Sequence, residues 1–263
     1  MNEVGMMTAK QIKTAEELFT FLKQEFEKII AEHQLLDEKI NIQARTLTPK
    51  EAIGETKRQD YPILVGKELM LEATFRDAKG QAFTDSPADF QGDLKDVLAL
   101  DLAKDPYARG IFIATLNAVM RSLGLAEHTI HCKNEEPEDC AKEMVAYLQE
   151  HYQKENKEPI KITQIGFQPA ILEQISKVFQ VRILDLNPEQ IGKKKFGVLV
   201  EDGIQAYANA IDWADLVLCT GSTLCNGSLV NFLDIGKEVV FYGTTLAGAA
   251  PLLGLKRACF YSK

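Results

Sequence analysis

Apolar residues in the first half of the chain recur at helical spacing in some stretches and alternate with polar residues in others. Leu18 and Leu22 belong to the first kind of pattern, which predicts an amphipathic helix over 15–33. Thr14 and Glu17 form a capping-box signature at its start. Further helices are expected over 49–53, 93–102, 106–124 and 137–153, and strands over 40–47, 62–76 and 81–84, with a hairpin turn at Lys79-Gly80. Strands followed by helices indicate an α+β arrangement.

The pattern changes in the second half, where short apolar strands alternate with helical segments. Strands are expected over 160–166, 181–184, 196–200, 215–220, 238–242 and 257–261, and helices over 169–179, 204–211 and 226–233. This alternation predicts βαβ units and a mostly parallel sheet. The polar stretch 151–159 separates the two patterns. The sequence therefore predicts an α/β protein with an α+β domain over 1–155 and a Rossmann-like ligand-binding domain over 156–263.

Charge and composition narrow the classes of partner. The formal net charge is −8, which disfavours nucleic acid and an anionic membrane because phosphate binding is driven by clustered Lys and Arg. No apolar stretch approaches the roughly 20 residues that span a bilayer, and the N-terminus lacks the pattern of a signal peptide. Five cysteines without an export signal predict reduced thiols in the cytoplasm. Base rates favour a homodimer.

Two of the expected strands end at residues that could contact a ligand, a glycine in one case and an aspartate in the other. Gly166 and Pro169 frame a strand-to-helix turn where the backbone can approach a ligand and the helix start can attract an anion. Asp185 follows the next strand, near the position where an acidic residue of a dinucleotide-binding fold would bind a ribose hydroxyl. The alternative role for Asp185 is to cap the Asn187-Pro188 turn. The full glycine fingerprint of dinucleotide binding is missing, so a nicotinamide or flavin dinucleotide is not favoured.

Small and hydroxyl-bearing residues gather in two later loops. The stretch 220–228 follows a strand of buried type and supplies Gly221, Ser222, Thr223, Asn226 and Gly227. Such amides and hydroxyls can bind phosphate, carboxylate or another oxyanion, although a well-capped turn without a ligand is the alternative. A second loop supplies Thr244 and Thr245. Two such loops on neighbouring strand ends favour a pocket.

The candidate metal ligands lie in the first half. His131, Cys132 and Cys140 bring an imidazole and two thiols within ten positions. Nitrogen and thiolate ligands suit zinc and other borderline or soft transition metals. The spacing matches no zinc-finger template, and the alternative is that these are ordinary turn residues.

Four motifs together resemble one family. They are Gly166-Phe167-Gln168-Pro169, Asp185-Leu186-Asn187-Pro188, the run from Ala214 to Ser228, and the segment from Gly243 to Gly254. The family is the one described as "putative heavy-metal chelation". The resemblance implies a Rossmann-like domain packed on an α+β domain similar to the N-terminal domain of enolases, with a pocket between them. It also implies that Asn117, in the long apolar helix, reaches that pocket.

The leading hypothesis is therefore a protein that binds a small anionic molecule or a metal complex at the interdomain cleft, with a role in heavy-metal chelation or metal-related metabolism. The alternative is an enzyme that uses a nucleotide-like or adenosyl cofactor, such as a methyl or alkyl transferase. A scaffold protein is a third hypothesis, disfavoured by the glycine and hydroxyl residues at the strand ends. Whether the protein catalyses a reaction stays open at this point.

Overall fold

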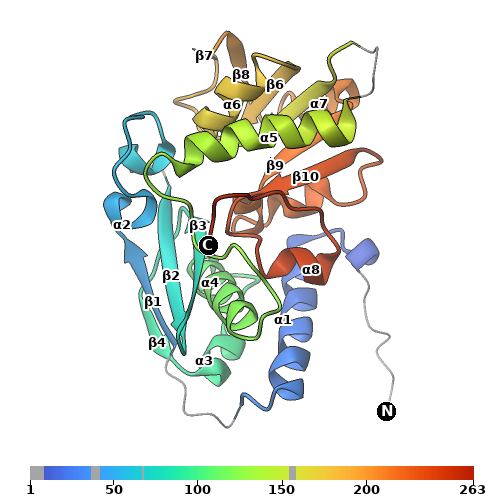
Figure 1. Cartoon of the computed structure of the whole chain (residues 1–263). Coiled ribbons are helices and arrows are strands. Elements are labelled where there is room, and N and C mark those ends of the chain that lie inside the picture. The colour runs from blue at the N-terminus through green and yellow to red at the C-terminus, as the bar shows by residue number, and fades with distance from the viewer. Residues whose placement is uncertain (1–8, 37–41, 67, 154–157) are drawn as a thin grey trace.

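The computed structural model describes residues 9–36, 42–66, 68–153 and 158–263 (Figure 1). The longer helices are α1 (Ala15–Glu32), α4 (Pro106–Ser122) and α5 (Glu136–Tyr152), and the shorter ones are α2 (Pro49–Ile53), α3 (Leu94–Ala99), α6 (Pro169–Ile175), α7 (Tyr207–Trp213) and α8 (Ala249–Leu253). The strands are β1 (Ile42–Leu47), β2 (Leu69–Phe75), β3 (Ala78–Thr84), β4 (Phe90–Gly92), β5 (Lys161–Ile165), β6 (Gln180–Asp185), β7 (Lys194–Lys195), β8 (Val198–Asp202), β9 (Leu216–Thr220) and β10 (Glu238–Tyr242). The prediction of a mixed α/β fold is confirmed.

The first half contains an antiparallel sheet in the order β3-β2-β1-β4, and α4 packs against β2 and β3. The expected turn at Lys79-Gly80 is wrong, because the chain reverses at Arg76 and Asp77 and Gly80 lies inside β3. A Cβ atom on Gly80 would lie 2.2 Å from the backbone nitrogen of Ala118. The glycine therefore permits close approach between β3 and α4 and does not form the turn.

One further expectation in the first half is corrected by local chemistry. Residues Pro62–Val65 form a 3-10 helix, so the strand expected over 62–76 begins only at Leu69. The fixed φ of Pro62 suits the first position of such a turn. Gly66 then ends the turn in the left-handed conformation, with φ of 71°.

The second half contains a six-stranded sheet in the order β10-β9-β5-β6-β8-β7, parallel throughout except for β7. This confirms the predicted mostly parallel sheet. The strand expected over 257–261 is a single bridge between Arg257 and Phe241. The helix expected over 226–233 is the 3-10 turn Ser228–Phe232, preceded by another at Gly221–Leu224.

The two halves share one apolar core. Helix α1 packs against α8, as Figure 1 shows, and the same buried cluster contains Phe26, Phe112 and Leu246. Helix α5, which precedes the predicted domain boundary at 155, packs against α6 of the second half. At the C-terminus, Lys263 exchanges two backbone hydrogen bonds with Ile130. In the part of the chain described by the structure, no helix combines the length and apolar character needed to cross a membrane.

Candidate functional site

The order of the parallel strands creates a gap at the carboxyl end of the sheet. From β5 the chain adds β6 and β8 on one side, then crosses to add β9 and β10 on the other. The loops after β5 and β9 therefore diverge, and ligands of open α/β sheets bind at such a switch point. Gly166, with φ of 82°, ends β5 there, and a Cβ atom on it would lie 2.7 Å from Cγ2 of Thr220.

A cavity of about 570 Å³ opens at this switch point. Its walls come from both halves of the chain. The first half contributes Ile53, Thr56, Tyr61, Pro62, Ile63, Glu68, Phe83, His131, Cys132, Asn134, Pro137, Cys140 and Met144. The second half contributes Ile165 to Gln168, Ile171, Leu184 to Leu186, Gly203, Ile204, Tyr207, Thr220, Ser222, Thr223, Asn226, Ser228, Asn231, Phe232, Tyr242, Gly243, Thr245, Ala258, Cys259 and Ser262. The volume lies within the range of about 300–1,000 Å³ typical of small-molecule sites.

The loop after β9 places three of its predicted residues in the cavity wall, namely Ser222, Thr223 and Asn226. Its shape is held by hydroxyl groups: Thr223 Oγ1 donates to the carbonyl of Thr220 at 2.7 Å, and the Thr220 and Ser222 hydroxyls lie 2.9 Å apart. The amide oxygen of Asn226 accepts the N–H of Ser228 at 2.9 Å. This hydrogen bonding is that of a well-capped turn, and the turn also faces the cavity.

The two glycines of that loop serve packing and do not line the cavity. A Cβ atom on Gly221 would lie 3.0 Å from Cβ of Leu246. Gly227 has φ of 77°, and a Cβ atom on it would lie 2.8 Å from Cβ of Ala15 in α1. Both glycines thus allow neighbouring segments to approach the loop closely.

Asn117 is buried beneath the cavity and does not line it. Its amide nitrogen donates to the carbonyl oxygens of Gln81 at 2.9 Å and of Thr244 and Thr245 at 3.2 Å. Its amide oxygen accepts the N–H of Gly248 at 2.7 Å. The side chain therefore holds the loop after β10 against β3.

Of the remaining predicted residues of the second half, some line the cavity and others are buried in the protein. Thr245 lines the cavity while its hydroxyl accepts the N–H of Phe83 at 2.9 Å. Thr244 is fully buried behind the wall, and its Oγ1 has no hydrogen-bond partner among the described residues. Pro169 is buried at the first position of α6.

Asp185 ends β6 and takes the capping role considered for it, while ligand binding stays a prediction. One carboxylate oxygen accepts the N–H of Asn187 and the other the N–H of Phe167, each at 2.7 Å. The first bond is the predicted turn cap, and the second fixes the loop after β5. Asp185 also lines the cavity.

His131, Cys132 and Cys140 lie together in one wall of the cavity. Nδ1 of His131 lies 2.6 Å from the carbonyl oxygen of Cys132. A carbonyl can only accept a hydrogen bond, so Nδ1 carries the proton and Nε2 keeps a free lone pair. Burial lowers the pKa of His131, which favours this neutral form.

Structure adds Cys259 to this wall, from a segment distant in sequence. Burial and then the neighbouring Cys140 and Cys259 raise the pKa of the Cys132 thiol, while burial and Cys259 raise that of Cys140 to about 11. These thiols are therefore protonated at neutral pH. Across the described ranges, no three His, Cys, Asp or Glu side chains are grouped so that they could hold a metal ion.

Glu68, like Cys259, is a residue of the cavity wall that sequence reasoning missed. It lies one residue before β2 and lines the cavity, and its carboxyl group has no hydrogen-bond partner among the described residues. Burial, followed by the charges of Asp185 and Asp85, raises its pKa to about 7. No local motif marks this glutamate, because only the packing of the two halves brings it to the strand ends.

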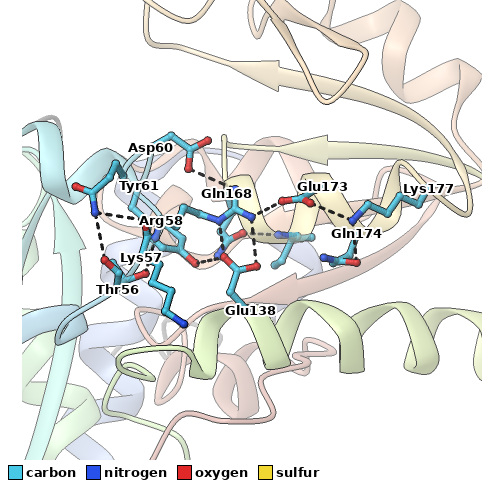
Figure 2. A network of polar contacts seen from close by, with 12 residues as sticks. Thr56, Lys57, Arg58, Asp60, Tyr61, Glu138, Gln168, Glu173, Gln174 and Lys177 are labelled. Atoms are coloured by element: carbon cyan, nitrogen blue, oxygen red, sulfur yellow. Dashed lines mark hydrogen bonds and ion pairs between the residues drawn. The ribbon is translucent and has the colours of Figure 1, made fainter.

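A salt-bridge network fixes the loop that forms another part of the wall (Figure 2). Arg58 donates from Nε and Nη2 to the two carboxylate oxygens of Glu138 in α5, and from Nη2 to Glu173 in α6. The hydroxyl of Tyr61, which lines the cavity, donates to Glu138 at 3.1 Å. Burial alone would lower the pKa of Arg58, but the hydrogen bonds to Glu138 and Glu173 raise it. The loop is thus attached to both helices.

Comparison with known proteins extends this description. Residues 151–255 match the DUF364 family. Its description is "Putative heavy-metal chelation", and the resemblance expected from the motifs is confirmed. The matched segment contains β5 to β10 and the loops after β5, β6, β9 and β10. Among curated proteins, none matches the chain.

Two solved structures of DUF364 proteins with unknown function are similar to the chain. The one from Pyrococcus horikoshii is 15% identical, with a TM-score of 0.51, and the match covers 87% of this chain and 79% of that one. The one from Desulfitobacterium hafniense is 13% identical, with a TM-score of 0.45, and the match covers 71% of this chain and 72% of that one. The first similarity supports the fold alone.

Proposed function

We propose that the cavity binds a small molecule that combines an apolar body with a positively charged centre, either a metal complex or an organic cation. The observation that carries the proposal is the pair of acidic side chains, Glu68 and Asp185, in a largely apolar cavity at the strand ends. Among the described lining residues there is no Lys or Arg. In such surroundings, charge interactions are stronger than in water.

This proposal refines the expectation of a small anionic ligand. A free anion would meet the carboxylate of Asp185 without a cationic side chain in the described wall. We therefore propose that an anionic group enters with its own bound metal ion, while the hydroxyl of Ser222 and the amide of Asn226 contact the organic part. Leu186 and Ile204, which are 56% and 79% exposed, supply apolar contacts for that part.

Heavy-metal chelation, the activity named for the matched family, supports the metal-complex form. The donors in the wall suit a soft or borderline metal in kind: the Nε2 lone pair of His131 and the thiols of Cys132, Cys140 and Cys259. Metal binding by these thiols would release their protons. Affinity for such a metal is therefore expected to fall as the pH is lowered.

A second candidate is an adenosyl cofactor, favoured by the position of Asp185. This carboxylate ends β6 beside the loop that begins at Gly166, where acidic residues of related folds bind ribose hydroxyls. The sulfonium of S-adenosylmethionine would supply the positive charge. S-adenosylhomocysteine lacks that charge and is otherwise closely similar, which makes the two compounds a matched pair.

Thermal unfolding with added compounds tests the proposal, because a ligand that binds only the folded state stabilises it by RT ln(1 + [L]/Kd). The compounds are the two adenosyl molecules, Zn²⁺ and Co²⁺ with and without citrate, and inorganic phosphate. We expect stabilisation by a cationic member and none by phosphate. Stabilisation by phosphate or S-adenosylhomocysteine alone would contradict the proposal.

Two variants locate the binding. The double variant Ser222→Ala/Asn226→Ala removes polar groups from the cavity wall and should weaken binding about tenfold, the effect of roughly 1.4 kcal/mol. Ser176→Ala is the matched control, because that hydroxyl donates to the Glu173 carbonyl and does not line the cavity. Equal affinity in both variants would place the ligand elsewhere.

A further inference from the structure

Glu68 brings an acidic group from the first half of the chain to the carboxyl ends of the strands of the second half. It lines the same cavity as Gly166, Asp185 and Tyr242. The hydroxyl of Tyr242 is already used, since it donates to the carbonyls of Ile165 and Gly166 at 3.2 Å. It is therefore not aimed at Glu68.

The charges that act directly on Glu68 are acidic. Asp185 lies at the end of β6 and Asp85 just after β3, and both disfavour the charged form of Glu68. Tyr242 in β10 and Cys225 in the loop after β9 are also near it, His131 lines the same cavity, and the guanidinium of Arg109 acts on Cys225. Burial raises the pKa of Tyr242 and of Cys225, so both stay neutral.

A partly buried carboxyl in a largely apolar cavity costs folding free energy when it has no described partner, because its charged form loses part of its hydration and gains no hydrogen bond or ion pair. By contrast, the other acidic residue of the wall, Asp185, is fixed by two backbone N–H groups. Carboxyl groups held in this costly state cluster at functional sites. Glu68 has the placement and the surroundings of such a group.

We infer that Glu68 selects the charge of the ligand: its carboxyl is protonated in the empty cavity and ionises when a positively charged group enters. This inference rests on the proposed function and adds that ionisation of Glu68 is coupled to binding of the cation. The O–H bond of the carboxyl breaks, the proton passes to the buffer, and the carboxylate faces the incoming cation. The net change is the exchange of one proton for one cationic ligand.

Exchange of a proton for a cation has a definite pH dependence. Below the pKa of about 7, the ligand must displace the proton, so affinity should rise about tenfold per pH unit and level off above that pKa. Glu68→Gln keeps the shape of the side chain and cannot ionise. In this variant the pH dependence should disappear for an organic cation and become weaker for a metal, whose binding also displaces thiol protons. Affinity above pH 7 should fall at least about tenfold.

The ligand-free protein provides the first test, which is independent of any ligand. The pKa of Glu68 is higher in the folded state than its ordinary value of 4.5, so its favourable contribution is present below pH 4.5 and lost as pH rises through about 7. Glu68→Gln should therefore melt roughly 3–6 °C higher than the wild type at pH 8, with the difference shrinking toward pH 4.5. Glu16→Gln, at an exposed site, is the control.

The second test measures binding of Zn²⁺ alone and of putrescine alone at pH 6 and pH 8, by calorimetry in two buffers with different ionisation enthalpies. We expect putrescine to release a proton on binding to the wild type at pH 6 and none on binding to Glu68→Gln. Zn²⁺ should release fewer protons from Glu68→Gln than from the wild type, because the thiols of the wall can also lose protons to a metal. The zinc and putrescine arms distinguish a metal ion from an organic cation.

The outcomes separate the two claims. Cation binding that is equal in wild type and Glu68→Gln would overturn the inference and leave the proposed function standing. Failure of both cations to bind, together with a lower melting temperature of Glu68→Gln at pH 8, would overturn the inference. The proposed function is tested separately, by whether a cationic compound of the thermal-unfolding screen stabilises the protein.

Discussion

Carboxyl groups are paired with a cation in the Arg58 network and unpaired in the cavity, although the loop that carries Arg58 also forms part of the cavity wall. In the network, Glu138 and Glu173 are paired with one guanidinium (Figure 2). In the cavity, Glu68 lies near Asp185 and Asp85 and has no partner among the described residues. The paired groups hold the loop to α5 and α6. The unpaired group lowers stability and leaves its charge available to a ligand.

The largest effect should come from breaking the network at its centre. Arg58 is only 15% exposed and Glu138 19%, so Arg58→Ala would leave Glu138 without its cation and Glu173 paired with Lys177 alone. We expect a loss of about 2–4 kcal/mol in the free energy of unfolding, measured with urea at pH 7. Arg58→Lys should restore only part of it, because lysine lacks the bidentate geometry. A loss under about 0.5 kcal/mol in Arg58→Ala would contradict the structural role.

The network and the cavity should also respond to pH with opposite signs. Hydrogen bonds from Arg58 and Lys177 lower the pKa of Glu173, so its contribution is present above its ordinary pKa of 4.5 and lost as pH falls through the lower folded value. Glu173→Gln should therefore lose about 1 kcal/mol at pH 7, and the loss should shrink as the pH falls below 4.5. Urea unfolding at several pH values checks this, and a loss independent of pH would show that ionic pairing is not the cause.

Asp185 has features of both regions, because its carboxylate accepts two backbone hydrogen bonds and the residue also lines the cavity. Asp185→Asn keeps one acceptor oxygen and replaces the other by an N–H donor opposite the N–H of Phe167 or Asn187. We expect a loss of about 1 kcal/mol in the free energy of unfolding. It should also weaken the binding of a cation by calorimetry. Unchanged stability would mean that these two backbone bonds do not hold the loops.

The smallest effect belongs to an exposed pair on the surface. Lys50 and Glu55 are 2.6 Å apart, and their side chains are 76% and 78% exposed. Lys50→Ala should leave the urea midpoint at pH 7 essentially unchanged, because exposed ion pairs contribute little. This variant calibrates the others, since a large effect here would indicate that charge removal alone destabilises the protein.

Local signals in the sequence predicted local structure well. The capping box at Thr14 is formed as expected, because all its atoms lie within four residues. The glycine at position 80 misled the prediction, since glycine serves both turns and close packing, and only the tertiary fold shows that α4 crosses it. The alternation of short apolar strands with helices predicted the parallel sheet, because hydrophobic periodicity is a local signal that can be read directly from the sequence.

The site could be predicted in part. Loops at the strand ends, with Ser222 and Asn226, were found because the carboxyl ends of parallel strands meet at one edge. Asn117 was placed in the cavity by resemblance, whereas its hydrogen bonds show a buried structural role. Glu68 and Cys259 were missed because neither belongs to a motif. They reach the cavity only through packing between segments that are distant in the chain.

The most direct test of this account is a carbon-13 NMR titration of the side-chain carboxyl groups in the ligand-free protein. The resonance of Glu68 would be assigned by its absence from the Glu68→Gln variant. The account predicts that this group titrates with a pKa of about 7 and that a saturating cation lowers this value. A pKa near the ordinary 4.5 in the empty protein would contradict it, because the carboxyl would then already be ionised and have no proton to exchange.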